Sequence, residues 1–342
     1  MRKDVYYGEY LQLDKILDAQ LPESDKEGID AHDEMLFIII HQSYELWFKQ
    51  IIYELTSIHS IFSKNAINDN APDLYKVVHR LKRIGVILDV AVHQISIMET
   101  MTPLDFLDFR NLLRPASGFQ SIQFKIVEAM LGLKLEHRFG KEYYLSQLKE
   151  ADKEIIRKVE EGSSVIEEIN KWLERMPFFE DASLWKDYNG KGGDFWTDYR
   201  ATYDASLTAG EKQNLEVYDK VFYSDEFCKD RRFSCKANRA ALFIMLYRDY
   251  PLLQLPYQLL NLLLDVDELL SSWRSRHVNM VHRMIGKRIG TGGSSGKDYL
   301  KSAMDKHYIF QEIAELTTFL IERKNLPALP ETLEKRLGFV HT

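Results

Sequence analysis

DEMLFIIIHQSYELWFKQIIYELTSIHSIF, residues 33–62, is a long stretch without proline or glycine. Its apolar side chains recur at spacings of three and four, the period of one helix face: Ile40, Tyr44, Trp47, Ile51, Leu55 and Ile58. The first half is apolar almost all round, as in a helix that is buried on several sides, and His41 and Gln42 interrupt that surface. The stretch therefore predicts one long, buried helix.

The rest of the chain continues the helical pattern. Thr102, Pro103 and Asp105 are typical of a helix start, with the threonine as N-cap and the proline as first helical residue. Further helices are predicted over 73–100, from Pro103, over 121–131, as a solvent-facing pair in 141–175, from about Leu207, over 237–286 and over 298–324. The chain shows neither the alternation of a strand nor an internal repeat.

We therefore predict an all-α protein with one large helical domain. Its core comprises residues 1–138 and 236–342, and a helical insertion occupies residues 139–235. So many apolar helices in an acidic chain indicate that some helix faces are buried against other subunits.

Composition and charge argue against several classes of protein. The formal net charge is -7, whereas proteins that bind nucleic acids usually carry a basic face. The N-terminus lacks the apolar core of a signal peptide, and the most apolar run, 251–264, is too short and too interrupted to span a bilayer. Cys228 and Cys235 fit neither a disulfide framework nor a zinc motif, so we expect reduced thiols. These features predict a cytoplasmic protein without a nucleic-acid or membrane partner.

The glycine-rich stretch GTGGSSGK, residues 290–297, is not a phosphate-binding loop. The P-loop pattern needs a glycine where this chain has Thr291 and a hydroxyl where it has Asp298, and it follows a strand rather than a helix. Two interpretations remain, a flexible surface connection or a mobile lid whose backbone lies close to a ligand.

Histidines on two of the predicted helices are candidates for a cofactor site. His277 and His282 point roughly 140° apart on a helix, so only one of them can face a given ligand, and Trp273 shares the face of His277. A lone histidine is usually structural. His277 and His41 on separate helices are also compatible with a haem between them, since haem needs one neutral imidazole as axial ligand. The residues alone leave both interpretations open.

Four blocks of the sequence resemble the tryptophan 2,3-dioxygenase family. They are YGEYLQLDKIL, HDEMLFIIIHQSYELWFKQI, PLDFLDFRNLLRPASGFQSIQF and WRSRHVNMVHRMIGKRIGTGGSSGKDYL, and they occur in the order of that family over most of 6–135 and 237–325. The resemblance implies a homotetramer, a dimer of dimers, with one haem b in each subunit. It also implies that L-tryptophan and O2 become N-formyl-L-kynurenine, the first step of tryptophan breakdown by the kynurenine pathway.

The resemblance also assigns roles to individual residues. On the haem side it implies that His277 is the axial ligand of the iron, with Trp273 beside it and Ser117 at the distal face. On the substrate side it implies that His41 is the distal, catalytic histidine near the indole N–H, that Phe37 and Phe106 enclose the indole, and that Arg110 binds the carboxylate. Thr291 would hold the charged end of the amino acid, and the pocket of a neighbouring subunit would receive Tyr7, Tyr10 and Leu11.

Two other functions are kept as alternatives. A haem-binding sensor or carrier without turnover would need His277 and an apolar pocket, but it would not need Arg110 together with Thr291. A helical scaffold without a cofactor would need none of these residues.

Overall fold

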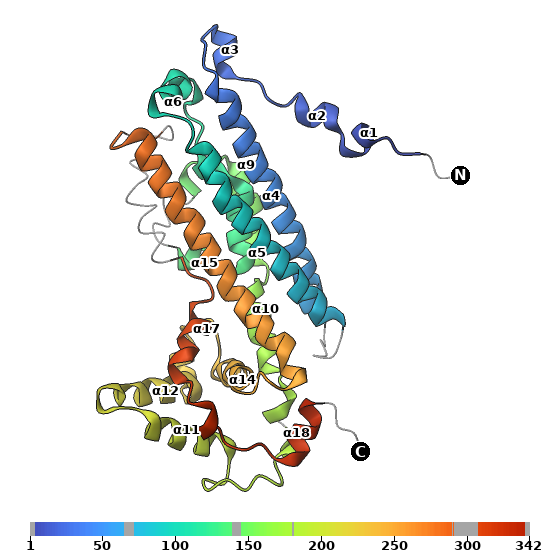
Figure 1. Cartoon of the computed structure of the whole chain (residues 1–342), viewed down its shortest axis with the longest axis vertical. Coiled ribbons are helices and arrows are strands. Elements are labelled where there is room, and N and C mark those ends of the chain that lie inside the picture. The colour runs from blue at the N-terminus through green and yellow to red at the C-terminus, as the bar shows by residue number, and fades with distance from the viewer. Residues whose placement is uncertain are drawn as a thin grey trace.

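The structure is a computed structural model, and it describes residues 4–64, 72–138, 145–179, 181–288, 290 and 307–338. Within these ranges every regular element is an α-helix or a 3-10 helix, and no strand is present. The prediction of an all-α protein is therefore confirmed. Figure 1 shows an elongated molecule in which long helices run side by side and shorter helices gather at one end.

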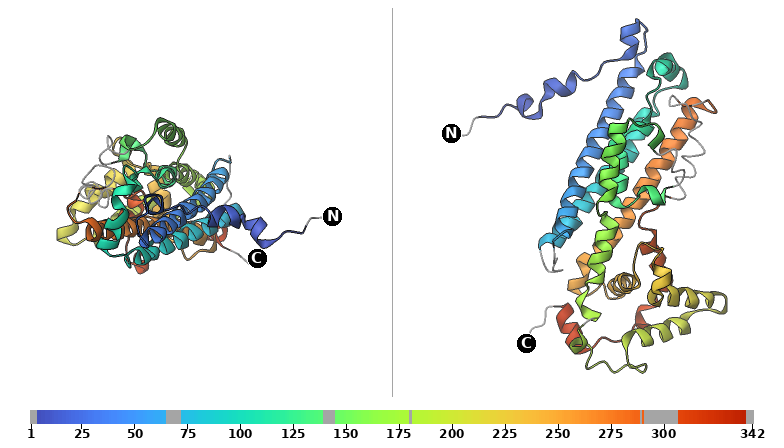
Figure 2. Two further views of the ribbon diagram at one scale, coloured as in Figure 1. Left: turned by 90° about the horizontal axis from the view of Figure 1, so that it is seen from above. Right: turned by 180° about the vertical axis from the view of Figure 1, so that it is seen from behind.

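Three long helices form the body of the molecule: α4 (Asp33–Phe62), α5 (Pro72–Met98) and α15 (Pro251–Ile285). Helix α5 packs against both α4 and α15, as the views from the front and from behind also show (Figures 1 and 2). The side chains in their contacts are fully buried, Ile51 and Leu55 on α4 for example. The apolar periodicity located α4 and α5 almost to the residue because long, continuous apolar stripes leave one period possible.

The helix α6 (Pro103–Arg110) lies across one end of this body, where it contacts α4 and α15. Its start is fixed by a capping box: the Thr102 hydroxyl accepts the Asp105 N–H at 3.3 Å, and the Asp105 carboxylate accepts the Thr102 N–H at 2.9 Å. This confirms the predicted N-cap. Two 3-10 turns, η1 (Asn111–Leu113) and η2 (Gly118–Gln120), then lead into α7 (Ile122–Leu131), which packs on α4.

Shorter helices make up the rest of the described residues. The N-terminal arm carries α1 (Tyr7–Leu11) and α2 (Leu13–Leu17), and α3 (Glu23–Glu27) precedes α4. The remaining α-helices are α9 (Glu150–Glu161), α10 (Val165–Glu174), α11 (Phe195–Ser206), α12 (Gln213–Tyr223), α13 (Asp225–Cys228), α14 (Cys235–Leu246), α17 (Gln311–Glu315) and α18 (Glu331–Leu337). The other 3-10 turns are η3 (Leu135–His137), η4 (Pro177–Phe179), η5 (Ala182–Leu184), η6 (Ala209–Glu211), η7 (Leu316–Phe319) and η8 (Arg323–Asn325).

Three sequence predictions are wrong in detail. Helix α10 does not face solvent, because Ile166, Ile169 and Leu173 are buried and the helix packs on α4 and α14. Helix α11 was missed, since its buried stripe is aromatic and follows a glycine-rich stretch. The helix expected over 298–324 is short in its described part: the Ile309 and Phe310 N–H groups bond to the Asp267 carboxylate instead of to helix carbonyls.

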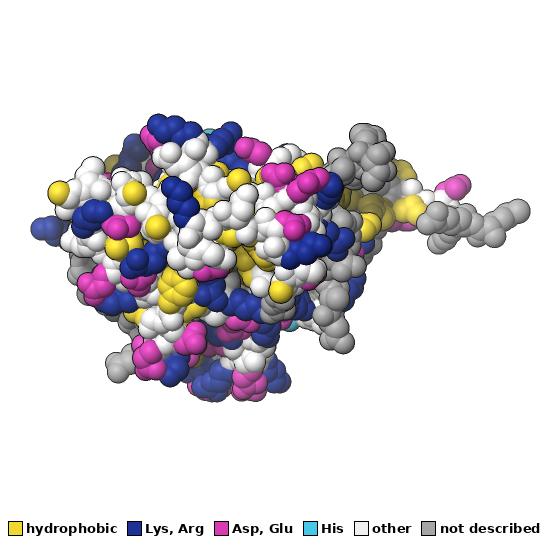
Figure 3. Space-filling model, turned by 90° about the horizontal axis from the view of Figure 1, so that it is seen from below, with side chains coloured by type: hydrophobic (Ala, Val, Ile, Leu, Met, Phe, Trp, Pro, Cys, Tyr) yellow, Lys and Arg dark blue, Asp and Glu magenta, His cyan; other side chains and the backbone are white. Residues whose placement is uncertain are grey.

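The surface shows two features that bear on partners. The arm with α1 and α2 extends away from the body (Figures 1 and 2), and Tyr7 and Tyr10 on it are 71% and 75% exposed. On the face seen from below, basic and acidic side chains are intermingled rather than sorted by sign (Figure 3). No single helix in the described ranges is long and apolar enough to cross a membrane; α5 and the segment Pro103–Leu113 pass that test together but are bent by 91°.

Candidate functional site

A cavity of about 320 Å³ lies where α4, α5, α6, α7 and α15 converge. Its volume is within the range of about 300–1,000 Å³ that is usual for small-molecule sites. Seven residues singled out from the sequence line it, although they come from four separate segments of the chain: Phe37, His41, Phe106, Arg110, Ser117, Trp273 and His277. The long helices thus bring the candidate residues to one place.

His277 on α15 is held as a neutral imidazole. Burial, with a further contribution from the nearby His41, lowers the pKa of His277 to about 4. Its ring lies parallel to that of Trp273, with the centroids 5.2 Å apart and 3° between the planes. No hydrogen bond to another described residue acts on its pKa. A neutral, oriented imidazole is the form of histidine that binds a metal ion.

His41 on α4 has its tautomer fixed by the backbone. Its Nδ1 lies 2.7 Å from the carbonyl oxygen of Phe37, one turn earlier. Because a carbonyl only accepts, Nδ1 carries the proton and Nε2 remains a hydrogen-bond acceptor. Burial lowers the pKa of His41, against the opposing effects of the Phe37 carbonyl and Glu45. His41 therefore brings to the cavity a neutral ring that can accept one hydrogen bond.

Aromatic rings form one wall of the cavity on the α4 and α6 side. The Phe37 ring lies 4.1 Å from the His41 ring and 5.8 Å from the Phe106 ring, centroid to centroid. Phe109, which is fully buried, supports both phenylalanines from behind at 5.6 and 5.4 Å. Such a wall suits a flat, apolar ring and keeps water away from it.

A second aromatic group surrounds Trp273, and sequence reasoning did not single it out as part of a site. Phe124, Tyr44 and Phe48 lie 4.8, 6.0 and 6.1 Å from Trp273, centroid to centroid. The Tyr44 hydroxyl donates to the Ala91 carbonyl on α5 at 3.2 Å, and burial raises the pKa of Tyr44 to about 12. Tyr44 and Phe48 belong to the apolar stripe of α4, and the sequence does not distinguish the core positions of such a stripe from its cavity positions. This group holds Trp273, and through it His277, in place.

Arg110 ends α6 and presents a cation to the cavity. Its side chain is buried, with 4% exposed, and burial together with the charges of Arg114 and Arg288 lowers the pKa of Arg110. The guanidinium still carries its charge at neutral pH. Arg288 lines the same cavity. Two arginines at an apolar cavity, with the charge of Arg114 acting on one of them, favour the binding of a carboxylate there.

A buried cluster of charges lines another part of the cavity. The Glu128 carboxylate accepts from Arg138 at 2.7 Å and from Arg274 at 2.6 Å. Burial raises the pKa of Glu128, but the two arginines outweigh it and bring the pKa below its usual value. Lys125, one turn before Glu128, is also buried, and burial lowers its pKa to about 8. Within this cluster three basic groups face one carboxylate, so it suits an anionic group on a ligand.

Comparison with known proteins identifies the family. A family model described as Tryptophan 2,3-dioxygenase matches residues 1–320. The chain belongs to the tryptophan 2,3-dioxygenase family. It is 44% identical to the tryptophan 2,3-dioxygenase of Alteromonas mediterranea, with 99% of each chain covered. It is 42% identical to that of Bdellovibrio bacteriovorus over 98% of each chain, and 41% identical to that of Dictyostelium discoideum over 99% of this chain and 89% of the relative.

Membership in the tryptophan 2,3-dioxygenase family confirms the resemblance, and the roles that it implied for four further residues stay predictions. Tyr7, Tyr10 and Leu11 lie on the arm, on α1, and do not line the cavity of their own chain. Thr291 lies outside the described residues. Gly286 and Gly290, which come shortly before it, do line the cavity. The glycine-rich loop therefore starts at the edge of the site.

Proposed function

We propose that this chain is a haem-dependent dioxygenase that cleaves the indole C2–C3 bond of L-tryptophan with O2 to give N-formyl-L-kynurenine. This reaction is the first step of the kynurenine pathway. The single observation that supports it best is that one cavity brings together the neutral imidazole of His277, the hydrogen-bond acceptor of His41 and the cation of Arg110. Membership in the tryptophan 2,3-dioxygenase family supports tryptophan as the substrate.

The residues present fit a haem b, one in each subunit. His277 would hold the iron through its neutral nitrogen, and the aromatic group around Trp273 fixes the ring plane of this histidine. The basic side chains of Lys125, Arg138 and Arg274 would supply positive charge for the two carboxylates of the porphyrin. When bound, haem supplies the dioxygen chemistry that protein side chains do not provide.

The substrate would be held at both ends by side chains of this chain. The guanidinium of Arg110 can bind the carboxylate of an amino acid through two parallel hydrogen bonds. Phe37 and Phe106 would enclose the indole, and their wall would exclude water from the reacting bond. Thr291, outside the described residues, would contact the ammonium and carboxylate groups, and Ser117 would help to hold the haem.

His41 would orient the indole rather than deprotonate it. Its Nε2 can accept the indole N–H, because Nδ1 is already bonded to Phe37. Its lowered pKa makes it a weak base, so full removal of the indole proton is not favoured. The hydrogen bond would set the angle at which the C2–C3 bond meets the oxygen.

The arm and the surface support an assembled enzyme. We propose a homotetramer, a dimer of dimers, in which Tyr7, Tyr10 and Leu11 of one subunit border the cavity of its neighbour. Exposed aromatic side chains on an extended segment are unfavourable unless another surface covers them. We also propose that residues 139–235 are an insertion in the helical core and that the protein works in the cytoplasm; both remain predictions.

The glycine-rich loop 290–296 would act as a lid over the amino acid. Its glycines permit a close backbone approach and a change between open and closed states. Hydrogen exchange in residues 288–296 should slow when L-tryptophan saturates the enzyme. Unchanged exchange at saturation would remove the lid from this proposal.

An absorption spectrum distinguishes the proposed function from its two alternatives. Reduced protein reconstituted with haem is mixed with L-tryptophan in air, and the absorbance of N-formylkynurenine is followed. A dioxygenase shows a Soret band and forms product; a haem-binding sensor or carrier shows the band but forms none. A protein without a Soret band after reconstitution would be a scaffold without a cofactor.

A further inference from the structure

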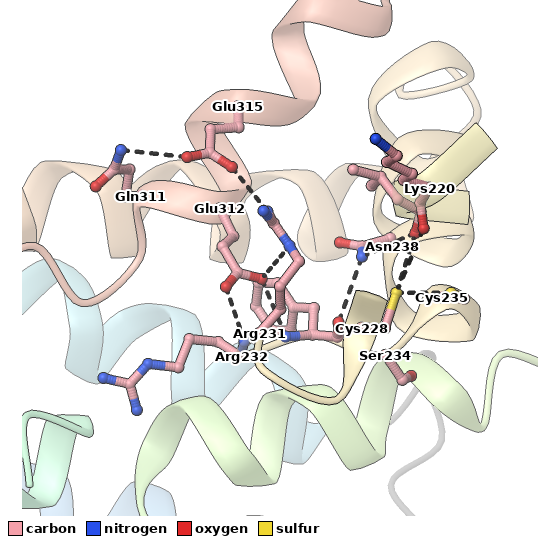
Figure 4. A network of polar contacts seen from close by, with 12 residues as sticks. Lys220, Cys228, Arg231, Arg232, Ser234, Cys235, Asn238, Gln311, Glu312 and Glu315 are labelled. Carbon is pink, nitrogen blue, oxygen red and sulfur yellow. Dashed lines mark hydrogen bonds and ion pairs between the residues drawn. The ribbon is translucent and has the colours of Figure 1, made fainter. Parts of the chain in front are cut away.

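The only two cysteines of the chain face each other far from the cavity. Cys228 is the last residue of α13 and Cys235 the first of α14. Their sulfur atoms lie 2.6 Å apart, closer than two unbonded sulfur atoms normally rest, whereas a disulfide bond is about 2.05 Å long. A dashed line in Figure 4 marks this contact between the two cysteines. Closing a disulfide between them therefore needs only a small movement of side chains.

The surroundings of the pair leave few other reactions open to it. Both cysteines are buried, so neither sulfur can reach another protein molecule. The Cys228 thiol donates to the Val221 carbonyl at 3.4 Å, and the same carbonyl accepts from Asn238 at 3.3 Å. Among the described residues no group of three or more histidine, cysteine or acidic side chains could hold a metal ion. The pair is thus no part of a metal centre there.

The loop between the two cysteines anchors α17. Arg231 binds Glu315 at 2.7 Å and lies 3.4 Å from Glu312, and the Glu312 carboxylate accepts the N–H groups of Arg232 and Phe233 at 2.7 and 3.1 Å (Figure 4). A link between the loop ends would hold these donors in position. It would therefore strengthen the attachment of α17 to the start of α14.

We propose that Cys228 and Cys235 are a reversible dithiol clamp, which closes to an intramolecular disulfide and braces the 229–234 loop against α17. Closure removes two electrons and two protons from the pair. An azo compound such as diamide accepts them, and its N=N bond becomes the N–N bond of a hydrazine. This inference does not depend on haem or on the proposed reaction.

Burial makes the Cys228 thiol slow to ionise. With the Cys235 sulfur close by, it raises the pKa of Cys228 to about 12, so Cys228 stays protonated. One sulfur would add to the N=N bond of diamide, and the other would then displace the hydrazine as the disulfide forms. Because both thiols are buried, we expect a slow reaction.

The test counts thiols before and after oxidation. The full-length holoprotein is reduced, freed of reductant, incubated with excess diamide and then unfolded in the presence of an alkylating reagent. We expect the alkylated thiols to fall from two to none, the chain to remain a monomer on a non-reducing denaturing gel, and dithiothreitol to restore both thiols. Peptide mapping should find Cys228 and Cys235 in one disulfide-linked species.

Thermal unfolding of the same samples measures whether the disulfide stabilises the fold. For so short a loop in a chain of this size we expect oxidation to raise Tm by about 3 °C. The matched variants Cys228→Ala and Cys235→Ala each retain one thiol, and their Tm should not respond to diamide. Three results would overturn the proposal: two thiols that stay free in excess diamide, a separate adduct on each thiol, or disulfide-linked dimers. The thiol count of the wild-type protein decides the matter even if a variant fails to fold.

Discussion

At the level of single residues, His277 and His282 on α15 differ in exposure and in their neighbours. His277 is half-buried, neutral and stacked on Trp273, whereas His282 is exposed and its Nδ1 lies 3.4 Å from the Gly286 carbonyl. Both line the cavity, but only His277 has an aromatic neighbour that fixes its ring plane. The environment, rather than the spacing along the helix, thus supports His277 rather than His282 as the proposed ligand.

We expect His277→Gly to abolish normal haem ligation and His282→Ala to leave it largely intact. The measurement is the Soret band of the reconstituted, reduced protein. Added imidazole should restore the band in His277→Gly, since a free ligand can occupy the space of the lost side chain. If instead the His282 variant loses the band and the His277 variant retains it, the ligand assignment is reversed.

Arg110 should contribute to substrate binding through the planar geometry of its guanidinium group as well as through its charge. We expect Arg110→Ala to lower kcat/KM for L-tryptophan by roughly 30- to 4000-fold, equivalent to about 2–5 kcal/mol, with haem content unchanged. Arg110→Lys should fall in between, because an ammonium keeps the charge but loses the bidentate geometry.

The matched control for Arg110 is Arg114→Ala. Arg114 is exposed, although its charge acts on Arg110. We expect its loss to change kcat/KM by only a few-fold, because exposed charges interact weakly through water. Equal losses in both alanine variants would mean that general positive charge, not a specific carboxylate contact, is what the substrate needs.

The sequence could indicate several residues of this site but not the charge pairs behind them. The resemblance indicated His277, His41 and Arg110 because they lie in long characteristic blocks. The contacts of Glu128 with Arg138 and Arg274 join three separate segments, so no local pattern announces them. A signal was nevertheless present, since charged side chains interrupt the apolar residues 122–131.

At the level of elements, the N-cap of α6 is a local sequence signal that helps to place two side chains at the cavity. The helix carries both Phe106 and Arg110, and the capping box at Thr102 sets where it begins. The N-cap was predictable because it needs only residues close in sequence. The burial of α10 was not, because it depends on α4 and α14, which are distant in sequence.

We expect Thr102→Ala to destabilise the protein by about 0.5–2 kcal/mol, since the hydroxyl acceptor of the Asp105 N–H is lost. KM for tryptophan should rise as well, because fraying of α6 displaces two substrate contacts. Chemical denaturation and steady-state kinetics measure the two effects.

Thr100→Ala is the control for the cap. The Thr100 hydroxyl is exposed and donates to the Ile97 carbonyl at 2.7 Å, so it caps no helix start. We expect a change in stability within about 0.5 kcal/mol and an unaltered KM. If KM rises equally in both variants, the rise in Thr102→Ala does not come from loss of the helix cap.

At the level of the whole molecule, buried titratable groups should make the stability of the haem-free protein depend on pH. Burial lowers the pKa of both His277 and His307 to about 4, and it raises the pKa of Asp267 to about 6. As pH falls from about 6.5 to 4, the unfolded chain takes up protons on these histidines and the folded chain does not, which destabilises the fold by roughly 3 kcal/mol for each. Over a similar range the folded chain takes up a proton on Asp267 before the unfolded chain does, which offsets part of that loss.

We therefore expect the free energy of unfolding to fall between pH 6.5 and 4 by about the contribution of one histidine. His307→Asn should remove most of this net loss in the haem-free protein, because the Asp267 contribution then balances that of His277. Haem should flatten the profile in the same way, since a nitrogen bound to iron is not free to take up a proton. Urea unfolding at several pH values, with and without haem, measures both effects. A steep loss of stability that persists in haem-bound His307→Asn would show that groups other than these two histidines control it.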